Sequence, residues 1–231
     1  MNCIAIITAR GGSKRIPRKN IKDFCGKPII AYPILAALES RVFEEVMVST
    51  DDPEIAEISR GFGAAVPFMR SEATSDDKSN STDAVIEVLL EYAKMGKKFD
   101  YVSCIYPTAP FITAEKLKNA SKRIEALGAD SLIPVIPFSY PPQRGFVIRN
   151  EKLSFLHPEY TFTRSQDLET MYHDVGQFYF AKVDRLLEYK SFIMPNLVPL
   201  VVPEEESQDI DNESDWKLAE LKYKHFVTKE I

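Results

Sequence analysis

The chain has 231 residues, of which 45% are hydrophobic and 27% charged, with a formal net charge of −5. This length suits one large α/β domain or two small ones. The acidic balance argues against general nucleic-acid binding, and no apolar run approaches the ~20 residues of a membrane span. The three cysteines are scattered without metal-ligand spacing. With no signal peptide visible, we expect a cytoplasmic protein with neither nucleic-acid nor membrane partners.

Strand-like and helix-like patterns alternate along the first 136 residues. The predicted strands are 3–8, 46–49, 65–68, 101–106 and 131–136. The predicted helices are 29–38, 53–59, 82–95 and 114–127. Ser81 or Thr82 is expected to cap the third of these helices. This order predicts an α/β fold with a doubly wound, mainly parallel sheet and helices on both faces.

The alternation breaks at Pro137, where prolines begin an irregular region. This region contains a hairpin-like piece at 145–156. Beyond it we predict a return strand at 176–181, a helical turn at 184–189, a strand at 197–202 and a helix at 213–226. We therefore predict a single domain, 1–231, with an insertion at 137–175. Such excursions often mediate association, so we expect a homodimer that pairs through 137–175.

The most informative segment follows the first strand. Residues 10–20 read Arg-Gly-Gly-Ser-Lys-Arg-Ile-Pro-Arg-Lys-Asn, and every charged residue from 10 to 22 is Lys or Arg. In open α/β sheets, ligands bind at the carboxyl ends of strands, and Gly11-Gly12 lets backbone N–H groups approach phosphates. Because Arg10 and Arg18 can also fork onto phosphates, we predict a polyanion site, with a nucleoside triphosphate as best candidate. The standard P-loop and dinucleotide motifs are absent; the alternative is a solvated basic loop.

A second constellation is the pair Asp209 and Asp211, which follows the last predicted strand. Two carboxylates two residues apart in extended chain point to one side. They could share Mg²⁺, which binds proteins through one or two carboxylates plus substrate phosphates. The alternative is structural, since Asp211 or Asn212 could cap the final helix.

Polar and aromatic residues are dense at 163–179, as in a pocket for a sugar or a carboxylate. Arg164 is suited to a carboxylate, and Gln177 and Tyr179 to hydroxyls. His173 has no paired nucleophile in a recognisable motif, so it is at least as well explained as a structural histidine. A rigid turn at 106–110 either borders the same pocket or simply ends its strand.

Together these motifs resemble the cytidylyltransferases that activate nonulosonic (sialic-type) acids, over nearly the whole length. The similarity is carried by 4–20, 48–51, Arg70 with Ser75-Asp76, 107–110 and 209–211. Within that family, 106–113, 164–169 and 172–174 are most similar to enzymes acting on pseudaminic acid. Enzymes for N-acetylneuraminate usually carry Gln where this chain has Tyr106, and Arg-Pro-Asn-Gly where it has 173–176. These departures disfavour N-acetylneuraminate as the substrate.

The resemblance implies a Rossmann-like nucleotidyltransferase that converts CTP and a nonulosonic acid into the CMP-sugar and pyrophosphate without a protein nucleophile. The implied triphosphate site is Arg10, Gly11, Gly12, Ser13, Lys14 and Lys19. The implied cytosine and ribose site is Asn20, Arg70, Ser79, Asn80, Ser81 and Thr82. The implied sugar site is Tyr106, Thr108, Arg164, Gln166, His173, Gln177 and Tyr179.

The resemblance also implies a Mg²⁺ cofactor held by Asp209 and Asp211. The implied catalytic residues are Arg10, Lys14, Lys19 and Asp211, with either Asp211 or a metal-bound hydroxide as general base. Enzymes for legionaminate, N-acetylneuraminate or Kdo remain alternatives. A non-catalytic protein that binds nucleotide sugars is a further one.

Overall fold

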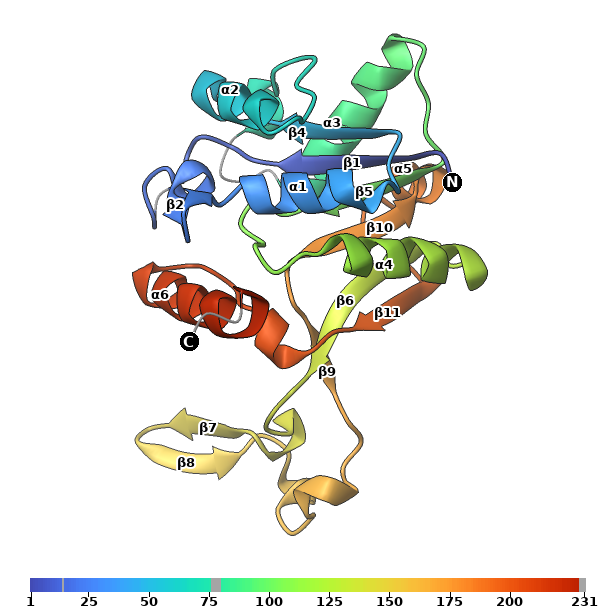
Figure 1. The fold of residues 1–231 in the computed structure, drawn as a ribbon. Helices are drawn as coiled ribbons and strands as arrows, with labels where there is room; N and C mark the ends of the chain where they lie inside the picture. The colour runs from blue at the N-terminus through green and yellow to red at the C-terminus, as the bar shows by residue number, and fades with distance from the viewer. Residues whose placement is uncertain (14, 76–79, 229–231) are drawn as a thin grey trace.

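The computed structural model describes residues 1–13, 15–75 and 80–228. Its centre is a mixed sheet with the strand order β11-β6-β10-β5-β1-β4, and β9 pairs with β6 (Figure 1). The strands of this sheet are β1 (Cys3–Thr8), β4 (Glu45–Ser49), β5 (Tyr101–Ile105), β6 (Ser131–Pro137), β9 (Tyr172–Asp174), β10 (Phe178–Lys182) and β11 (Leu197–Val201). Two short hairpins lie outside it, β2 (Asp23–Phe24) with β3 (Lys27–Pro28) and β7 (Phe146–Arg149) with β8 (Lys152–Phe155).

Helices cover both faces of the sheet, as predicted (Figure 1). They are α1 (Ala31–Ser40), α2 (Pro53–Gly61), α3 (Ser81–Lys94), α4 (Ala114–Ala126), α5 (Val183–Tyr189) and α6 (Glu213–Lys222). Strand β1 shows why two cores form, because its side chains alternate between faces. Ala5 and Ile7 pack in one cluster with Ile34 of α1, whereas Ile4 packs in the other with Val85 of α3. In the described part of the chain, no helix is both long and apolar enough to cross a membrane.

The sheet is mainly parallel, as predicted. Strand β1 runs parallel to β4 and β5, and β6 runs parallel to β11. Strand β10 is antiparallel to both β5 and β6. The reason is the excursion that leaves β6 and returns through β9 to the same edge of the sheet, so the next strand must run backwards (Figure 1).

Three local predictions were wrong in detail. Residues 65–68 make only an isolated bridge between Ala65 and Met47, since Pro67 has no N–H to extend a ladder. Helix α3 is capped by Asn80, whose side chain accepts from the Asp83 N–H at 2.9 Å, and not by Ser81 or Thr82. The last helix changes to π-helical geometry over Tyr223–Thr228.

The start of α6 is fixed by a reciprocal capping box. The side-chain oxygen of Asn212 accepts from the N–H groups of Ser214 at 2.9 Å and Asp215 at 3.1 Å. In return, Asp215 Oδ2 accepts from the N–H groups of Asn212 and Asp211, both at 3.0 Å. The cap therefore also holds the backbone of the Asp209–Asp211 segment.

We expect Asn212→Ala to lower the free energy of unfolding by about 1 kcal/mol, because the replacement leaves helix N–H groups without their acceptor. Urea denaturation measures the change. Asn212→Asp is the matched control and should stay near the wild type, since aspartate caps as well as asparagine. Equal stability of Asn212→Ala and wild type would contradict this assignment.

Candidate active site

A cavity of about 420 Å³ opens where β1 and β5 end. It lies at the carboxyl edge of the sheet between β1, whose chain connection leads to β4 on one side, and β5, whose connection leads to β6 on the other. Its lining comes from the basic loop, the start of α3 and the turn after β5. These residues are Thr8, Arg10, Gly12, Ser13, Arg15, Ile16, Lys19, Asn20, Ser81, Tyr106, Pro107 and Thr108. The structure thus brings together three segments that the sequence presents separately.

The basic loop curls back onto its own beginning. Asn20 is buried, and its side-chain amide donates to the Arg10 carbonyl at 2.9 Å. The Gly11 N–H donates to Asp51 Oδ1 at 2.8 Å. Arg18 adopts a left-handed conformation, with φ of 54°, just before the 3-10 turn Lys19–Ile21. These contacts shape the loop around the cavity.

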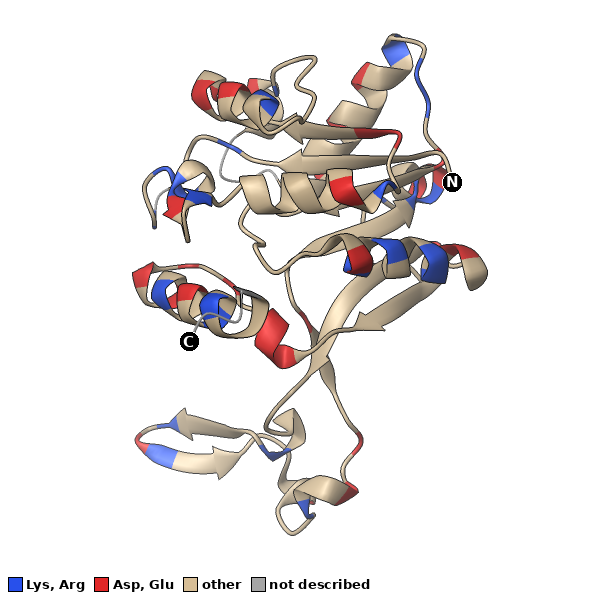
Figure 2. Cartoon of the chain, in the orientation of Figure 1, with Lys and Arg blue, Asp and Glu red and all other residues tan. Residues whose placement is uncertain are grey.

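Acids from two distant segments balance the cations of the loop. Arg18 pairs with Asp52 at the start of α2, and Arg15 pairs with Asp211 at 2.7 Å. Lys22 pairs with Glu213 at the start of α6, also at 2.7 Å. In Figure 2 this basic segment lies between α2 and α6, which carry acidic residues.

The expectation that Arg18 forks onto phosphates needs correction. Both of its terminal nitrogens face carboxylates, those of Asp52 and Glu54. The hydrogen bond with Arg18 lowers the pKa of Asp52, and the same bond raises the pKa of Arg18. Arg18 therefore anchors the loop to α2, because its charge is already matched.

Lys19 joins the basic loop to the predicted acidic pair. Its Nζ donates to the Ile210 carbonyl at 2.7 Å, across 191 positions of sequence. Burial lowers the pKa of Lys19, and the nearby charges of Asp211 and Asp209 act in the opposite direction. The ammonium therefore lies in the cavity wall with both carboxylates in electrostatic reach.

The predicted capping role is confirmed for Asn212, which caps α6, whereas the Asp211 carboxylate pairs with Arg15 at 2.7 Å. Asp211 is partly buried and Asp209 is exposed. Within residues 1–13, 15–75 and 80–228, no group of three or more His, Cys, Asp or Glu side chains is arranged to hold a metal. A metal here would need oxygen ligands from substrate or water besides these two carboxylates.

The other predicted nucleotide residues do not all line the cavity. Lys14 and Ser79 are outside the described residues. Arg70 donates to the Ser49 carbonyl at 2.7 Å and to its hydroxyl at 3.0 Å, and burial lowers its pKa. It closes the end of β4 and does not line the cavity. At the start of α3, Ser81 lines the cavity and Asn80 is the N-cap of the helix.

The predicted sugar residues divide into three places. Tyr106 and Thr108 line the cavity. Gln177 and Tyr179 are buried behind that wall, and the Gln177 amide donates to the Glu206 carbonyl at 2.8 Å. Three others lie on the excursion or its return strand, away from this cavity: Arg164, Gln166 and His173.

Sequence reasoning missed the role of Arg15, which lines the cavity and pairs with Asp211. It also missed Asp51 and Asp52, which hold the loop at Gly11 and Arg18. Asp52 did carry a local signal, because it precedes a proline in the first turn of a helix. Its pairing with the loop depends on the sheet bringing β1 and β4 together, which no local pattern shows.

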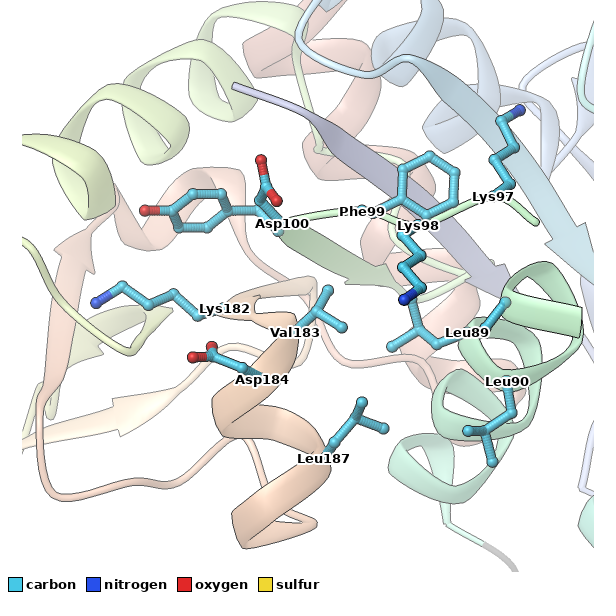
Figure 3. A pocket seen from close by; sticks show the side chains of 12 residues that line it. Leu89, Leu90, Lys97, Lys98, Phe99, Asp100, Lys182, Val183, Asp184 and Leu187 are labelled. Carbon is cyan, nitrogen blue, oxygen red and sulfur yellow. The ribbon is translucent and has the colours of Figure 1, made fainter.

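A second cavity, of about 560 Å³, lies between α3 and α5 near the amino end of β5. Figure 3 shows leucines from both helices at this site, with Phe99 and two lysines from the segment before β5. Lys97 pairs with Glu45, and Lys182 pairs with Asp130 at 3.0 Å. None of the predicted site residues lines it, so the candidate site is the cavity at the carboxyl edge.

A crevice beside β1, walled by a glycine-containing cationic loop and by a helix N-terminus, defines a Rossmann-like nucleotide-binding enzyme. The sequence pattern of the Cytidylyltransferase family matches residues 4–195. The chain belongs to this family and is a CTP-dependent nucleotidyltransferase.

Relatives match the chain along nearly its full length. It is 40% identical to a pseudaminic acid cytidylyltransferase of Campylobacter jejuni, covering 97% of both chains. It is 37% identical to a CMP-N,N'-diacetyllegionaminic acid synthase of Legionella pneumophila, covering 95% of both. The fold is similar to a CMP:2-keto-3-deoxy-manno-octonic acid synthetase complexed with CTP, with a TM-score of 0.71, 19% identity and full coverage of both chains.

The two loop glycines give a matched test of how tightly the loop approaches α2. A Cβ on Gly11 would lie 2.8 Å from Asp52 Oδ2 and 3.0 Å from Asp52 Cβ, whereas a Cβ on Gly12 meets nothing within 4 Å. We expect Gly11→Ala to lower the free energy of unfolding by about 1–3 kcal/mol through overpacking. Gly12→Ala should change it by no more than about 0.5 kcal/mol. Thermal or urea unfolding compares the two, and equal losses would refute the close approach.

Proposed function

We propose that the enzyme transfers CMP from CTP to the anomeric hydroxyl of a nonulosonic acid, pseudaminic acid foremost, and releases pyrophosphate. The observation that supports this most is the Lys19–Ile210 contact, which joins a phosphate-type loop to the acidic pair. A basic loop alone would suit a protein that only binds a nucleotide. The two carboxylates of Asp209 and Asp211 beside it would also allow metal-assisted transfer of CMP. The 40% identity to a pseudaminic acid cytidylyltransferase supports the choice of sugar.

In the proposed reaction the sugar hydroxyl attacks the α-phosphorus in line, and the bond to the bridging oxygen of the β-phosphate breaks. No protein nucleophile is required, so catalysis consists of positioning and charge neutralisation. Arg10, Gly12, Ser13 and Lys19 line the cavity and would bind the triphosphate. Lys19, together with Lys14, would stabilise the charge that develops on the leaving pyrophosphate.

The acidic pair fits a magnesium ion. Both carboxylates are hard oxygen ligands, and Mg²⁺ binds through one or two carboxylates plus substrate phosphates. When bound, the ion would neutralise phosphate charge and lower the pKa of a coordinated hydroxyl. Asp209 and Asp211 would hold it. Arg15, whose side chain is largely exposed, pairs with Asp211 at 2.7 Å and so positions that carboxylate beside the cavity.

Tyr106 and Thr108 line the cavity, and their polar groups would bind the acceptor sugar. The legionaminate relative, at 37% identity, makes that sugar the second candidate. N-acetylneuraminate and Kdo are further candidate substrates, because other members of the family use them. The acidic pair Asp209 and Asp211 next to Lys19 disfavours a non-catalytic role.

A pyrophosphate-release assay with CTP and Mg²⁺ tests the proposal over four sugars: pseudaminate, legionaminate, N-acetylneuraminate and Kdo. We expect the highest kcat/KM with pseudaminate, and no release when EDTA replaces Mg²⁺. Release with none of the four would refute the proposed function, and a preference for another sugar would replace pseudaminate with that sugar.

Two variants test the proposed roles of Lys19 and Asp211 in the same assay. Lys19→Ala should lower turnover by on the order of 10²-fold or more, as the loss of a transition-state donor does. Asp211→Asn should abolish turnover while CTP binding survives in part. A wild-type rate in either variant would remove that residue from the mechanism.

We also propose that the enzyme is a homodimer that pairs through 137–175. This segment projects from the domain (Figure 1) and exposes many apolar side chains, with Phe162 97%, Ile148 76% and Leu153 62% exposed. Apolar surface of this extent is typical of association sites. In such a dimer, Arg164, which pairs with Asp167 at 2.8 Å, and Gln166 would lie on the segment that meets the other copy.

Leu153→Asp should convert the dimer to a monomer, because a charge placed in an apolar interface is not solvated. Ile193→Asp is the matched control, since Ile193 is 63% exposed but lies outside the excursion. Light scattering measures the mass of the wild type and both variants. A monomeric wild type would refute the dimer.

A further inference from the structure

The segment that carries the acidic pair depends on contacts at its two ends. Residues 207–211 connect the 3-10 turn Glu204–Glu206, which follows β11, to α6. At the end next to α6, the Asp215 carboxylate accepts from the Asp211 N–H at 3.0 Å. At the other end stands Glu206. The contacts of Glu206 therefore determine where the segment with the two carboxylates begins.

Lys116 joins Glu206 to the turn that follows β5. Its Nζ pairs with Glu206 Oε2 at 2.6 Å and donates to the Phe111 carbonyl at 2.8 Å. The Lys116 side chain is 11% exposed and that of Glu206 37%. A single, largely buried ammonium therefore holds the beginning of the acidic segment against the turn 106–111, part of which lines the cavity.

Two further contacts join the same turn and the same segment. The buried Gln177 amide donates to the Glu206 carbonyl at 2.8 Å, and the Gln177 carbonyl accepts from the Tyr106 N–H at 2.9 Å. The side chains of Phe111 and Ile210 belong to one buried hydrophobic cluster. Because Ile210 lies between the two acids, this cluster and the lysine act on the same segment.

The place of Lys116 in the fold is unfavourable for stability alone. It lies in the first turn of α4, after the N-cap Thr113, where the positive end of the helix dipole repels a cation. Burial lowers the pKa of Lys116, and the hydrogen bond with Glu206 acts in the opposite direction. A buried ion pair is often no more stable than apolar side chains of similar volume. The cost of this ion pair therefore points to a role in placing the acidic segment.

We propose that Lys116 is a positioning residue that, through Glu206, holds Asp209 and Asp211 where they can bind the metal of a metal–CTP complex. Neither Lys116 nor Glu206 lines the cavity, so they act through the segment and not on the substrate. The inference rests on the proposed function, because it concerns how the proposed Mg²⁺ ligands are placed.

The test is calorimetric binding of CTP to Lys116→Met, once with Mn²⁺ and once with EDTA, without any sugar. Methionine keeps an unbranched apolar side chain and removes the ammonium, and Glu206 stays solvated because it is partly exposed. We expect the Kd of Mn²⁺–CTP to rise by about 10-fold, as when a residue that orients metal ligands is lost, and the Kd of CTP in EDTA to stay within about 2-fold. Loss of a cation that acted by charge alone would weaken CTP binding more in EDTA, because free CTP carries more negative charge.

Lys182→Met is the matched control. Lys182 likewise donates to a carbonyl, that of Gly128, and pairs with Asp130, but it lies opposite Tyr101 at the amino end of β5. This variant should leave both Kd values unchanged.

A double-mutant cycle tests whether Lys116 acts through Glu206. Glu206→Ala should raise the Kd of Mn²⁺–CTP by the same factor as Lys116→Met. The double variant should be no worse than either single variant, because both break the same contact.

An unchanged Kd of Mn²⁺–CTP in Lys116→Met, or equal rises of both Kd values, would overturn the proposal. Additive losses in the double variant would overturn it too, and so would a fall in the Tm of Lys116→Met much larger than that of Lys182→Met, which would indicate a merely structural role. A wild type that binds CTP equally with Mn²⁺ and with EDTA refutes the proposed metal site instead, and this inference falls with it. Pyrophosphate release by the wild type tests the proposed function separately, because the calorimetry contains no sugar.

Discussion

The contact between the Lys19 ammonium and the Ile210 carbonyl is the constraint on which the site depends. A loop in which every charge is positive would spread by its own repulsion unless anions or carboxylates surrounded it. The chain supplies carboxylates from the start of α2 and from the segment before α6. Such exposed pairs contribute only about 0–1 kcal/mol each. They therefore set the geometry of the loop and prevent repulsion, while fold stability comes from elsewhere.

That stability comes from burial around β1, where Ile4, Ile6 and Ile7 are fully buried. Each such side chain contributes about 1.5–3 kcal/mol relative to exposure, which exceeds any ion pair in the loop. The loop can therefore hold several cations beside the cavity, because the strand before it and Asn20 after it are fixed. Because the buried core provides the stability and the ion pairs only set the geometry of the loop, a protein with a net charge of −5 can carry a polyanion site.

The sequence was sufficient to predict a structural element or a site where the signal lies within one short segment. The unbroken apolar run of β1 predicted a central strand, and the glycines and cations after it predicted a polyanion site. It was insufficient to predict ion pairs between residues that are far apart in the sequence. Arg18 faces Asp52 only because β1 and β4 are neighbours in the sheet, and Arg15 faces Asp211 only because α6 docks beneath the loop. Asn80 was missed as the cap of α3 because two other good capping residues follow it.

The reversed direction of β10 links the two halves of the site. Phe178, at the beginning of β10, pairs with Ile105, at the end of β5. The excursion therefore re-enters the sheet at the edge where the nucleotide loop lies, and Asp174 and Tyr179 arrive behind Tyr106. A parallel β10 would have begun at the opposite edge, with the excursion far from the cavity. The antiparallel strand thus brings Tyr179 against Tyr106, in the wall of a cavity lined by residues of the first 110.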